Sequence, residues 1–467
     1  LDCKGGSFPI RYLGIPLHHD KLRKEDIQPL IDKIMKRIAG WRGKLLSYKG
    51  RLILIQACLA SIPIYLLSFF KFPKWAIEMI NSQMANCSWN AFEGHRKLHL
   101  ANWKMVCMKK EFGGLGIPNL QDVNLCLLGS WVKRYYESEG KPGKMIFDHK
   151  YMSSKINIFA PNLSPSASRF WKGLKTTIQA LKLGYRWKVG SGEKVRFWED
   201  TWFGTSPLAV QFWPIYSICN EQTNSVKEVW DGTQLKLTFR RNFDDRLMEQ
   251  WYQLVEIASS LTLTNETDAL VWQLENRGVY STSSLYHVIN FRGVQPVIIP
   301  SVWKLNIPPK IHVFLWLLAN NKLMTRDNLR KRQIIKPLEC VFCSEAETCS
   351  HLFFDCVVSR QIWPLVSNHF GVDTGTDFES VARLWIANKK HSALNTANAA
   401  VLWCIWKYRN SMIFNNTMWT SIKQVMRLIL KTIKNWVILS SDGTAERLEA
   451  FSTHLATDLR QPLMIGG

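Results

Sequence analysis

Acidic residues are scarce in this sequence of 467 residues. It has 37 Asp and Glu against 60 Lys and Arg, so its formal net charge is +23 and its isoelectric point is about 9.6. Basic side chains gain affinity for polyanions by neutralising phosphates and releasing counterions. The deficit of negative charge therefore favours nucleic acid as the partner, with an acidic membrane surface as the alternative. An apolar content of 46% is ordinary for chains that bury a core, which excludes wholesale disorder.

Closely spaced cysteines are missing from the first half of the chain. No disulfide framework is indicated by its six scattered cysteines, Cys3, Cys58, Cys87, Cys107, Cys126 and Cys219. The first residues, LDCKGGSFPI, contain neither an initiator Met nor the basic and apolar regions of a secretory signal. We expect a partial chain from an intracellular protein of the cytoplasm or nucleus.

Long apolar runs are also rare, and Leu52–Phe70 is the single candidate for a membrane helix. Its 19 uncharged residues meet the length criterion. Pro63 would break the helical hydrogen bonds near the middle, and basic residues flank both ends, so no orientation is encoded. The sequence favours a buried helix that bends or ends at Pro63, and no transmembrane helix is expected.

The common catalytic motifs are absent as well. There is no Ser-His-Asp elbow, no HExxH pair and no P-loop, and the glycines of Glu111–Pro118 have neither Rossmann nor P-loop spacing, which favours a turn. The pair Asp244 and Asp245 superficially resembles carboxylates that hold two metal ions. Its context, RNFDDRLMEQW, instead predicts the start of a helix, where Asp is favourable for the helix dipole. We therefore expect no catalytic residues.

The fold class predicted from the sequence is mainly α with small β hairpins (α+β), in several domains. Apolar residues at spacings of three and four predict an amphipathic helix over 26–39, and later helices follow the same pattern. Hairpins are predicted over 185–198, around Gly190-Ser-Gly192, and over 268–280. The predicted divisions are 1–137 (thumb-like helices), 138–300 (linker and Trp-rich connector), 301–365 (zinc module), 366–440 (C-terminal helices) and 441–467 (polar tail).

One cysteine-rich motif carries a specific chemical signal. Cys340, Cys343, His351 and Cys356 follow the spacing C-x2-C-x7-H-x4-C. Two thiolates from a tight turn and a His and Cys from the next element can complete a tetrahedron suited to Zn²⁺. Four protein ligands leave no open position, so one structural zinc is predicted. Cys349 could replace the histidine or remain free, and buried cysteines without a metal are the alternative.

Seven segments, spread in order over about 430 residues, share the residue pattern of one known family. They are Phe8–Leu17 (FPIRYLGIPL), Trp41–Leu52 (WRGKLLSYKGRL), Ser61–Tyr65 (SIPIY), Gly113–Ile117 (GGLGI), Trp187–Trp202, Asp268–Tyr286 and Trp303–Trp363. They resemble the part downstream of the polymerase palm in plant LINE-type, non-LTR retrotransposon reverse transcriptases. The last segment resembles the reverse transcriptase zinc-binding domain, whose ligands map onto the four residues of the cysteine-rich motif.

The resemblance also implies that the catalytic carboxylates of the family are missing from this sequence. The family's paired catalytic aspartates lie upstream of a segment like Phe8–Leu17, and the residues after Ser440 offer no strand-borne carboxylates for ribonuclease H. We expect a truncated, non-enzymatic reverse-transcriptase-like product. A fragment of an active polymerase whose palm lies upstream is one alternative, and a purely structural zinc fold without selected activity is another.

The expected partner is RNA or single-stranded DNA, with weak sequence preference and with neither a membrane nor a small-molecule substrate. A basic helix beside the zinc module would bind phosphates, with stacking on exposed aromatic side chains. The residues predicted to make phosphate contacts are Lys310, Arg326, Arg330, Lys331 and Arg332.

Overall fold

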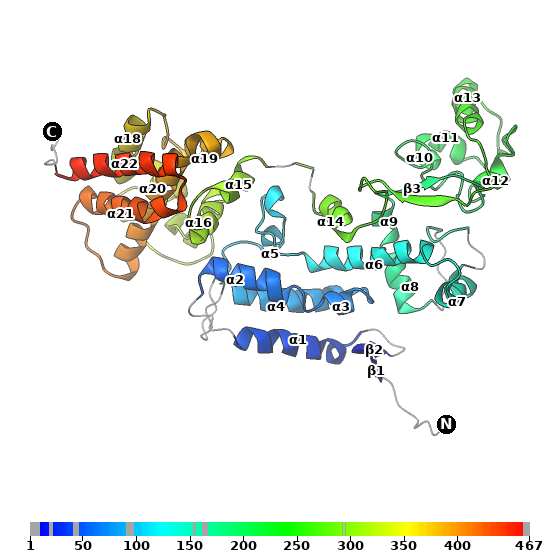
Figure 1. The fold of residues 1–467 in the computed structure, drawn as a ribbon, viewed down its shortest axis with the longest axis horizontal. Coiled ribbons are helices and arrows are strands. Elements are labelled where there is room, and N and C mark those ends of the chain that lie inside the picture. The colour runs from blue at the N-terminus through cyan, green and yellow to red at the C-terminus, as the bar shows by residue number, and fades with distance from the viewer. Residues whose placement is uncertain are drawn as a thin grey trace. The chain divides into compact units, whose positions relative to one another are not determined.

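Helices dominate the computed structural model, as the sequence predicted, and strands are few (Figure 1). The structure describes residues 10–17, 22–40, 46–89, 98–152, 156–160, 167–291, 293–294 and 296–460. Outside these ranges lie Cys3, residues 8–9 and 41–45 of the family-like segments, parts of the predicted linker (153–155 and 161–166) and the last seven residues of the predicted tail.

The chain is divided into two compact units. The first unit comprises residues 1–33, 61–80 and 119–291, and the second comprises 34–60, 81–118 and 292–467. The predicted boundaries at 137, 300 and 365 stay predictions.

The amphipathic pattern near the start of the chain forms the expected helix, α1 (Lys24–Ala39). Its five apolar positions at spacings of three and four are all buried, namely Ile27, Leu30, Ile31, Ile34 and Ile38. Glu25 and Asp26 in the first turn and Lys36 and Arg37 in the last turn complement the helix dipole. A second long helix in this part of the chain is α4 (Lys74–Trp89).

The described part of the first unit contains helices and two small antiparallel sheets. The sheets are β1 (Ile10–Tyr12) with β2 (Ile15–Leu17), and β3 (Tyr185–Lys188) with β4 (Ala269–Trp272). The remaining helices of this unit are α3 (Ile64–Leu67), α6 (Leu120–Tyr136), α7 (Pro142–Tyr151), α8 (Arg169–Lys175), α9 (Ile178–Leu181), α10 (Leu208–Gln211), α11 (Trp213–Tyr216), α12 (Val226–Val229), α13 (Asp245–Ser259) and α14 (Thr282–Asn290).

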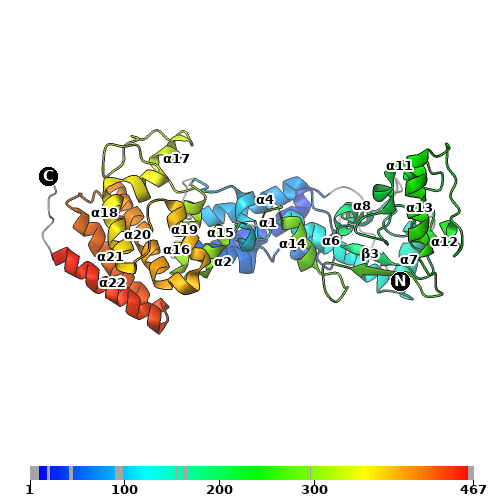
Figure 2. The same ribbon diagram turned by 90° about the horizontal axis from the view of Figure 1, so that it is seen from above.

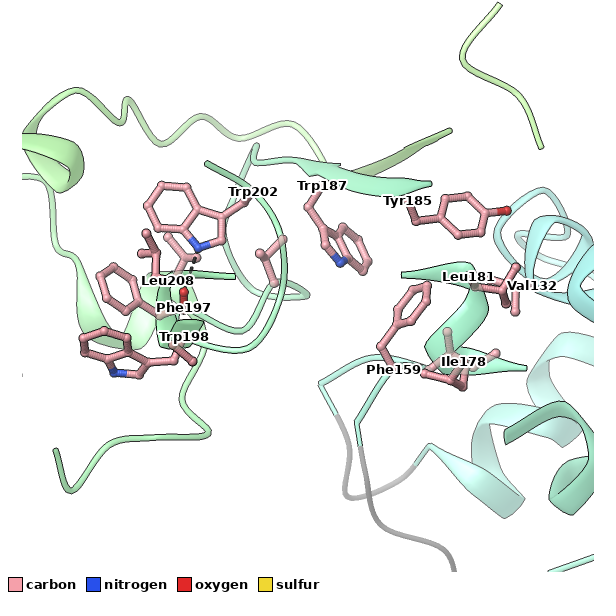
Figure 3. Close-up of a cluster of buried hydrophobic side chains, with 14 of the residues drawn as sticks. Val132, Phe159, Ile178, Leu181, Tyr185, Trp187, Phe197, Trp198, Trp202 and Leu208 are labelled. Carbon is pink, nitrogen blue, oxygen red and sulfur yellow. Dashed lines mark hydrogen bonds between the residues drawn. The ribbon is translucent and has the colours of Figure 1, made fainter. Parts of the chain in front are cut away.

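Aromatic residues of the Trp-rich connector form much of this unit's core (Figure 3). Phe197 and Trp198 are fully buried, and the indole N–H of Trp202 donates to the Phe197 carbonyl at 2.8 Å. Arg196 is buried beside them and donates to Asp200 at 2.6 Å. Each fully buried large apolar side chain contributes roughly 1.5–3 kcal/mol to the stability of the fold. Core packing therefore accounts for the many aromatic residues of this region.

The strand pairings of the two predicted hairpins are wrong, although the chain does turn at Gly278, whose carbonyl accepts the Trp272 N–H at 2.9 Å. Strand β3 pairs with β4, in the register Tyr185↔Trp272 to Lys188↔Ala269, and each predicted hairpin supplies one of the two strands. The reason is Asp268, whose carboxylate accepts the backbone N–H groups of Gly190 (2.7 Å), Gly192 (2.8 Å) and Lys194 (2.8 Å). The Gly-Ser-Gly turn therefore wraps around a distant carboxylate instead of reversing a strand.

The long apolar run is broken near Pro63, as predicted. It begins in α2 (Tyr48–Leu54), continues through a π-helical turn (Ile55–Leu59) and resumes in α3, for which Pro63 is the N-cap. Leu52, Ile55, Leu59 and Leu67 are buried. Within the described ranges, no helix is long and apolar enough to cross a membrane.

The second unit is a helical assembly in which α20, α21 and α22 pack together, as Figures 1 and 2 show. Its α-helices are α2, α5 (Trp103–Val106), α15 (Ile298–Ser301), α16 (Pro309–Ala319), α17 (Arg326–Arg330), α18 (Val357–Phe370), α19 (Phe378–Ile386), α20 (Asn388–Phe414), α21 (Ile422–Trp436) and α22 (Asp442–Arg460). Its described residues also form 3₁₀ helices at Lys110–Phe112, Val302–Lys304 and Val437–Leu439 and π-helical turns at Ile55–Leu59 and His351–Asp355.

The segment predicted as a polar tail from residue 441 is a helix over most of its length. Residues Asp442–Arg460 form the helix α22, which packs against α21 and α20. Leu448, Phe451 and Leu455 are buried on its inner face. Their spacing of three and four is helical, but many polar residues between them obscured the pattern in the sequence.

Candidate metal centre

The first two cysteines of the motif lie on a tight loop of the second unit. An antiparallel bridge between Glu339 and Ala346 closes this loop, and the Cys340 N–H donates to the Glu345 carbonyl at 2.7 Å. Between these paired ends the chain reverses, which presents Cys340 and Cys343 on the same loop. This is the two-thiolate turn that the C-x2-C spacing predicted.

The other two candidate ligands frame a π-helical turn, His351–Asp355. The Cys356 N–H donates to the His351 carbonyl at 2.7 Å, and Cys356 is the N-cap of α18. A wide turn of five residues thus places His351 at its start and Cys356 at its end. Its apolar members, Leu352, Phe353 and Phe354, are buried, which anchors the turn.

The four side chains converge as a zinc site requires. The ligand atoms of Cys340, Cys343, His351 and Cys356 all lie within 4.8 Å of one another. The Cys340 and Cys356 sulphurs are 3.9 Å apart, and the Cys343 sulphur is 3.2 Å from Nε2 of His351. With Zn–S of 2.3 Å and Zn–N of 2.0–2.1 Å, a tetrahedron needs separations of about 3.8 Å and about 3.6 Å. Donor types and spacing therefore both fit Zn²⁺.

The fifth cysteine of the segment lies elsewhere. The Cys349 sulphur is 3.9 Å from the Thr325 hydroxyl and does not belong to the converging group. Burial raises the pKa of the Cys349 thiol to about 11, and the hydrogen bond with Thr325 partly opposes this shift. Within the cluster, the hydrogen bond between Cys340 and Cys356 lowers the pKa of the Cys356 thiol and raises the pKa of the Cys340 thiol.

Residues 280–363 match the family model described as zinc-binding in reverse transcriptase. The segment contains all four converging ligands. The segment is thus similar to reverse transcriptase zinc-binding domains, and we refer to it as the zinc-binding domain. The match confirms the resemblance seen in the sequence and begins before the predicted boundary at residue 301. A putative ribonuclease H protein of Arabidopsis thaliana is 24% identical over 474 aligned positions, covering 96% of this chain and 72% of the relative.

A buried ion pair connects the zinc-binding domain to the long helix α20. Arg409 donates from Nε and Nη2 to the two carboxylate oxygens of Glu347, at 3.1 Å and 2.5 Å. The side chains are 3% and 0% exposed. Glu347 lies on the loop between Cys343 and His351, and its carboxylate also accepts the Arg326 N–H at 3.0 Å. One carboxylate thus joins the metal loop, the start of α17 and α20.

Aromatic packing strengthens this connection. Phe342, inside the two-cysteine loop, contacts Tyr408 and Trp419, with ring centroids 6.3 Å and 5.2 Å apart. Phe353, from the π-helical turn, lies 6.3 Å from the ring of Trp406 on α20. Glu347, Arg409 and Phe342 were not predicted from the sequence. The available signal was that Arg409 follows the apolar stretch Ala399–Trp406 of α20, since a cation on a buried helix face needs a partner.

The predicted phosphate-binding residues all lie within the zinc-binding domain and differ in exposure and in bonding partners. Arg330 on α17 and Lys310 on α16 are exposed. Lys331 is exposed but pairs with Asp327 at 3.0 Å. Arg332 donates to the carbonyl oxygens of His99 (2.6 Å) and Leu100 (2.8 Å), and Arg326 is half-buried. The predicted basic helix is thus a single five-residue turn, and Arg332 has a structural role in holding the segment near residue 100.

The pair of aspartates set aside in the sequence is confirmed as a helix start. Asp244 is the N-cap of α13, and its carboxylate accepts the Leu247 N–H at 2.8 Å. Asp245 is the first helical residue. Gly113 and Gly116 have φ of +86° and +77°, which glycine adopts readily. This glycine-rich segment therefore forms a turn, as expected.

Proposed function

We propose that this chain is a non-catalytic, reverse-transcriptase-like protein of LINE-type retroelement origin that binds one structural zinc and binds RNA or single-stranded DNA with little sequence preference. The observation that carries the proposal is the role of Glu347. It links the Cys₃His loop to α17 and α20, so that the metal site fixes the position of the cations beside it.

In this proposal Cys340, Cys343, His351 and Cys356 hold the zinc as three thiolates and one neutral imidazole. The ion supplies folding free energy, since the ligands gather only in the folded domain, and roughly 10–16 kcal/mol is typical of such sites at neutral pH. With four protein ligands there is no position for a reacting water. The metal is therefore structural.

Nucleic-acid binding is supported by charge and by its distribution. The formal net charge is +23, and Arg330 on α17 and Lys310 on α16 are exposed cations within the zinc-binding domain. Lys331 adds a third cation that would have to exchange Asp327 for a phosphate. Contacts of this kind reach the backbone and not the bases, so affinity depends on salt more than on sequence.

We infer that the chain has neither polymerase nor ribonuclease H activity, although the Arabidopsis relative is named as a putative ribonuclease H protein. Two-metal phosphoryl chemistry needs converging carboxylates. Across the described ranges, the Cys₃His cluster is the one group of three or more Cys, His, Asp or Glu side chains close enough to share a metal ion. Asp244 is engaged as a helix cap.

The test is binding of a fluorescent 20-nucleotide RNA to the zinc-loaded chain over a series of KCl concentrations. Log K should fall by about 0.7 per phosphate contact for each unit of log salt. Arg330→Ala should reduce that slope by about 0.7. The matched control is Arg427→Ala, which removes an exposed charge from α21 and should leave the slope unchanged.

Two outcomes would contradict the proposal. Affinity that is constant from low to high salt would favour the rival function, a purely structural zinc fold whose cations are only solvated. Primer extension with Mg²⁺, or cleavage of an RNA–DNA hybrid, above that of a heat-inactivated sample would contradict the non-catalytic assignment.

A further inference from the structure

Basic side chains converge on a tryptophan of the second unit outside the zinc site. The Lys49 ammonium lies 4.9 Å from the centroid of the Trp303 ring, and the Lys110 ammonium lies 5.2 Å from it. The ring of His312 is 5.9 Å away, and its Nε2 is 3.0 Å from the Leu305 carbonyl oxygen. We call Lys49, Lys110, Trp303 and His312 the Trp303 cluster.

The fold builds this cluster from distant parts of the sequence. Helix α2, which carries Lys49, packs against α16, which carries His312. The Gln56 side chain donates to the Leu115 carbonyl at 2.9 Å, and the Trp316 indole donates to the Gly113 carbonyl at 2.8 Å. These two bonds tie the glycine turn after Lys110 to the helical segments on either side. The convergence is therefore a property of the packed unit and not of one mobile side chain.

The cluster holds like charges without a carboxylate. No ion pair within the described ranges includes Lys49 or Lys110, and Glu111, beside Lys110, pairs with Lys109 at 3.3 Å. Burial lowers the pKa of Lys49, and the charge of Lys110 lowers it further. Burial also lowers the pKa of His312, partly opposed by the Leu305 carbonyl, and both lysines add to the lowering.

Cation–π contact with the indole offsets only part of this repulsion, because exposed contacts contribute about 0.5–1 kcal/mol each. An anion between the ammonium groups would remove the repulsion and gain two charge-assisted hydrogen bonds. Phosphate suits the arrangement, since lysine binds it as a compact point charge.

We propose that the Trp303 cluster binds a phosphate group through Lys49 and Lys110. We take this phosphate to come from the backbone of a bound nucleic acid, and in that respect the inference rests on the proposed function. Free inorganic phosphates offer the same chemistry and are distinguished by the experiment. It places a second contact on the second unit, apart from the cations of α16 and α17.

The experiment measures how fast an acetylating reagent modifies individual lysines of the full, zinc-loaded chain, read by mass spectrometry. Samples contain the 20-nucleotide RNA, pyrophosphate, or chloride at equal ionic strength. Lys434, exposed on α21, is the internal control. We expect RNA to slow modification of Lys49 and Lys110 at least threefold relative to Lys434, and pyrophosphate to do so if a free phosphate also enters.

A binding measurement with variants completes the test. Lys49→Gln combined with Lys110→Gln should lower the slope of log K for RNA against log salt by about 1.4, two contacts of about 0.7 each. The matched pair Lys431→Gln and Lys434→Gln removes the same charge from an exposed face of α21 and should not lower it.

The outcomes separate the two proposals. RNA binding through Arg330 without protection of Lys49 and Lys110 by either ligand would overturn the phosphate site and leave the proposed function. Protection by pyrophosphate in a chain that fails to bind RNA would support the phosphate site and overturn the proposed function. An unchanged salt slope in the Lys49 and Lys110 variant would overturn a nucleic-acid source.

Discussion

Arg409→Gln removes the cation that pairs with the buried Glu347 and tests whether the zinc-binding domain depends on α20. The pair is shielded from solvent, with side-chain exposures of 3% and 0%. Without Arg409, the two hydrogen bonds at 3.1 Å and 2.5 Å are lost, and the carboxylate keeps only the Arg326 N–H at 3.0 Å.

The expected cost is large because a charge is left buried. Breaking a buried pair from one side typically destabilises by about 3–5 kcal/mol. Replacing both partners, as in Glu347→Leu with Arg409→Met, removes the buried charge and leaves one unsatisfied N–H of Arg326, which costs about 1–3 kcal/mol. The double variant should therefore be more stable than Arg409→Gln.

The assay is zinc release during urea unfolding, followed with a colorimetric chelator, because this signal reports the second unit alone. With an m value of about 2 kcal/mol/M, the midpoint should fall by about 1.5–2.5 M in Arg409→Gln. The control, Lys331→Gln, breaks a surface pair with Asp327 (3.0 Å) in the same unit and should cost less than about 1 kcal/mol. A midpoint in Arg409→Gln equal to that of the wild type would refute the reasoning.

Three further changes test separate parts of the structure. Cys349→Ser should leave the zinc content at one per chain, since this thiol faces Thr325, and zinc loss on elemental analysis would return it to the ligand set. Gly375→Ala should destabilise by at least about 2 kcal/mol in urea unfolding, because φ is +82° and a Cβ would lie 1.9 Å from the Trp363 ring; wild-type stability would contradict that packing. Asp268→Ala leaves three backbone N–H groups without their acceptor and should cost about 2–4 kcal/mol in urea unfolding followed by tryptophan fluorescence, which reports the Trp-rich first unit. A loss below about 0.5 kcal/mol would show the turn to be independent of Asp268.

Features governed by neighbouring residues were predictable from the sequence. The spacing of Ile27, Leu30 and Ile34 determines the buried face of α1, and Pro63 interrupts the apolar run because it cannot continue the helical hydrogen bonds. The C-x2-C-x7-H-x4-C spacing likewise identified four side chains whose ligand atoms meet within 4.8 Å.

Features that depend on distant partners were missed. The turn at Gly190 and Gly192 looked like a hairpin because Asp268, which lies 76 residues beyond Gly192, gives no local signal. Arg332 was expected to face phosphate, yet it donates to carbonyls 232 and 233 residues away. Glu347 and Arg409 are separated by 62 residues, so their pairing could be seen only in the folded unit.

The zinc content of the purified chain is the most direct test of the account. Elemental analysis should find one zinc per chain in the wild type and none in the variant that combines Cys340→Ala with Cys343→Ala. A wild-type chain without zinc, or full retention of zinc in that double variant, would contradict the claim that the Cys₃His cluster is a structural metal site.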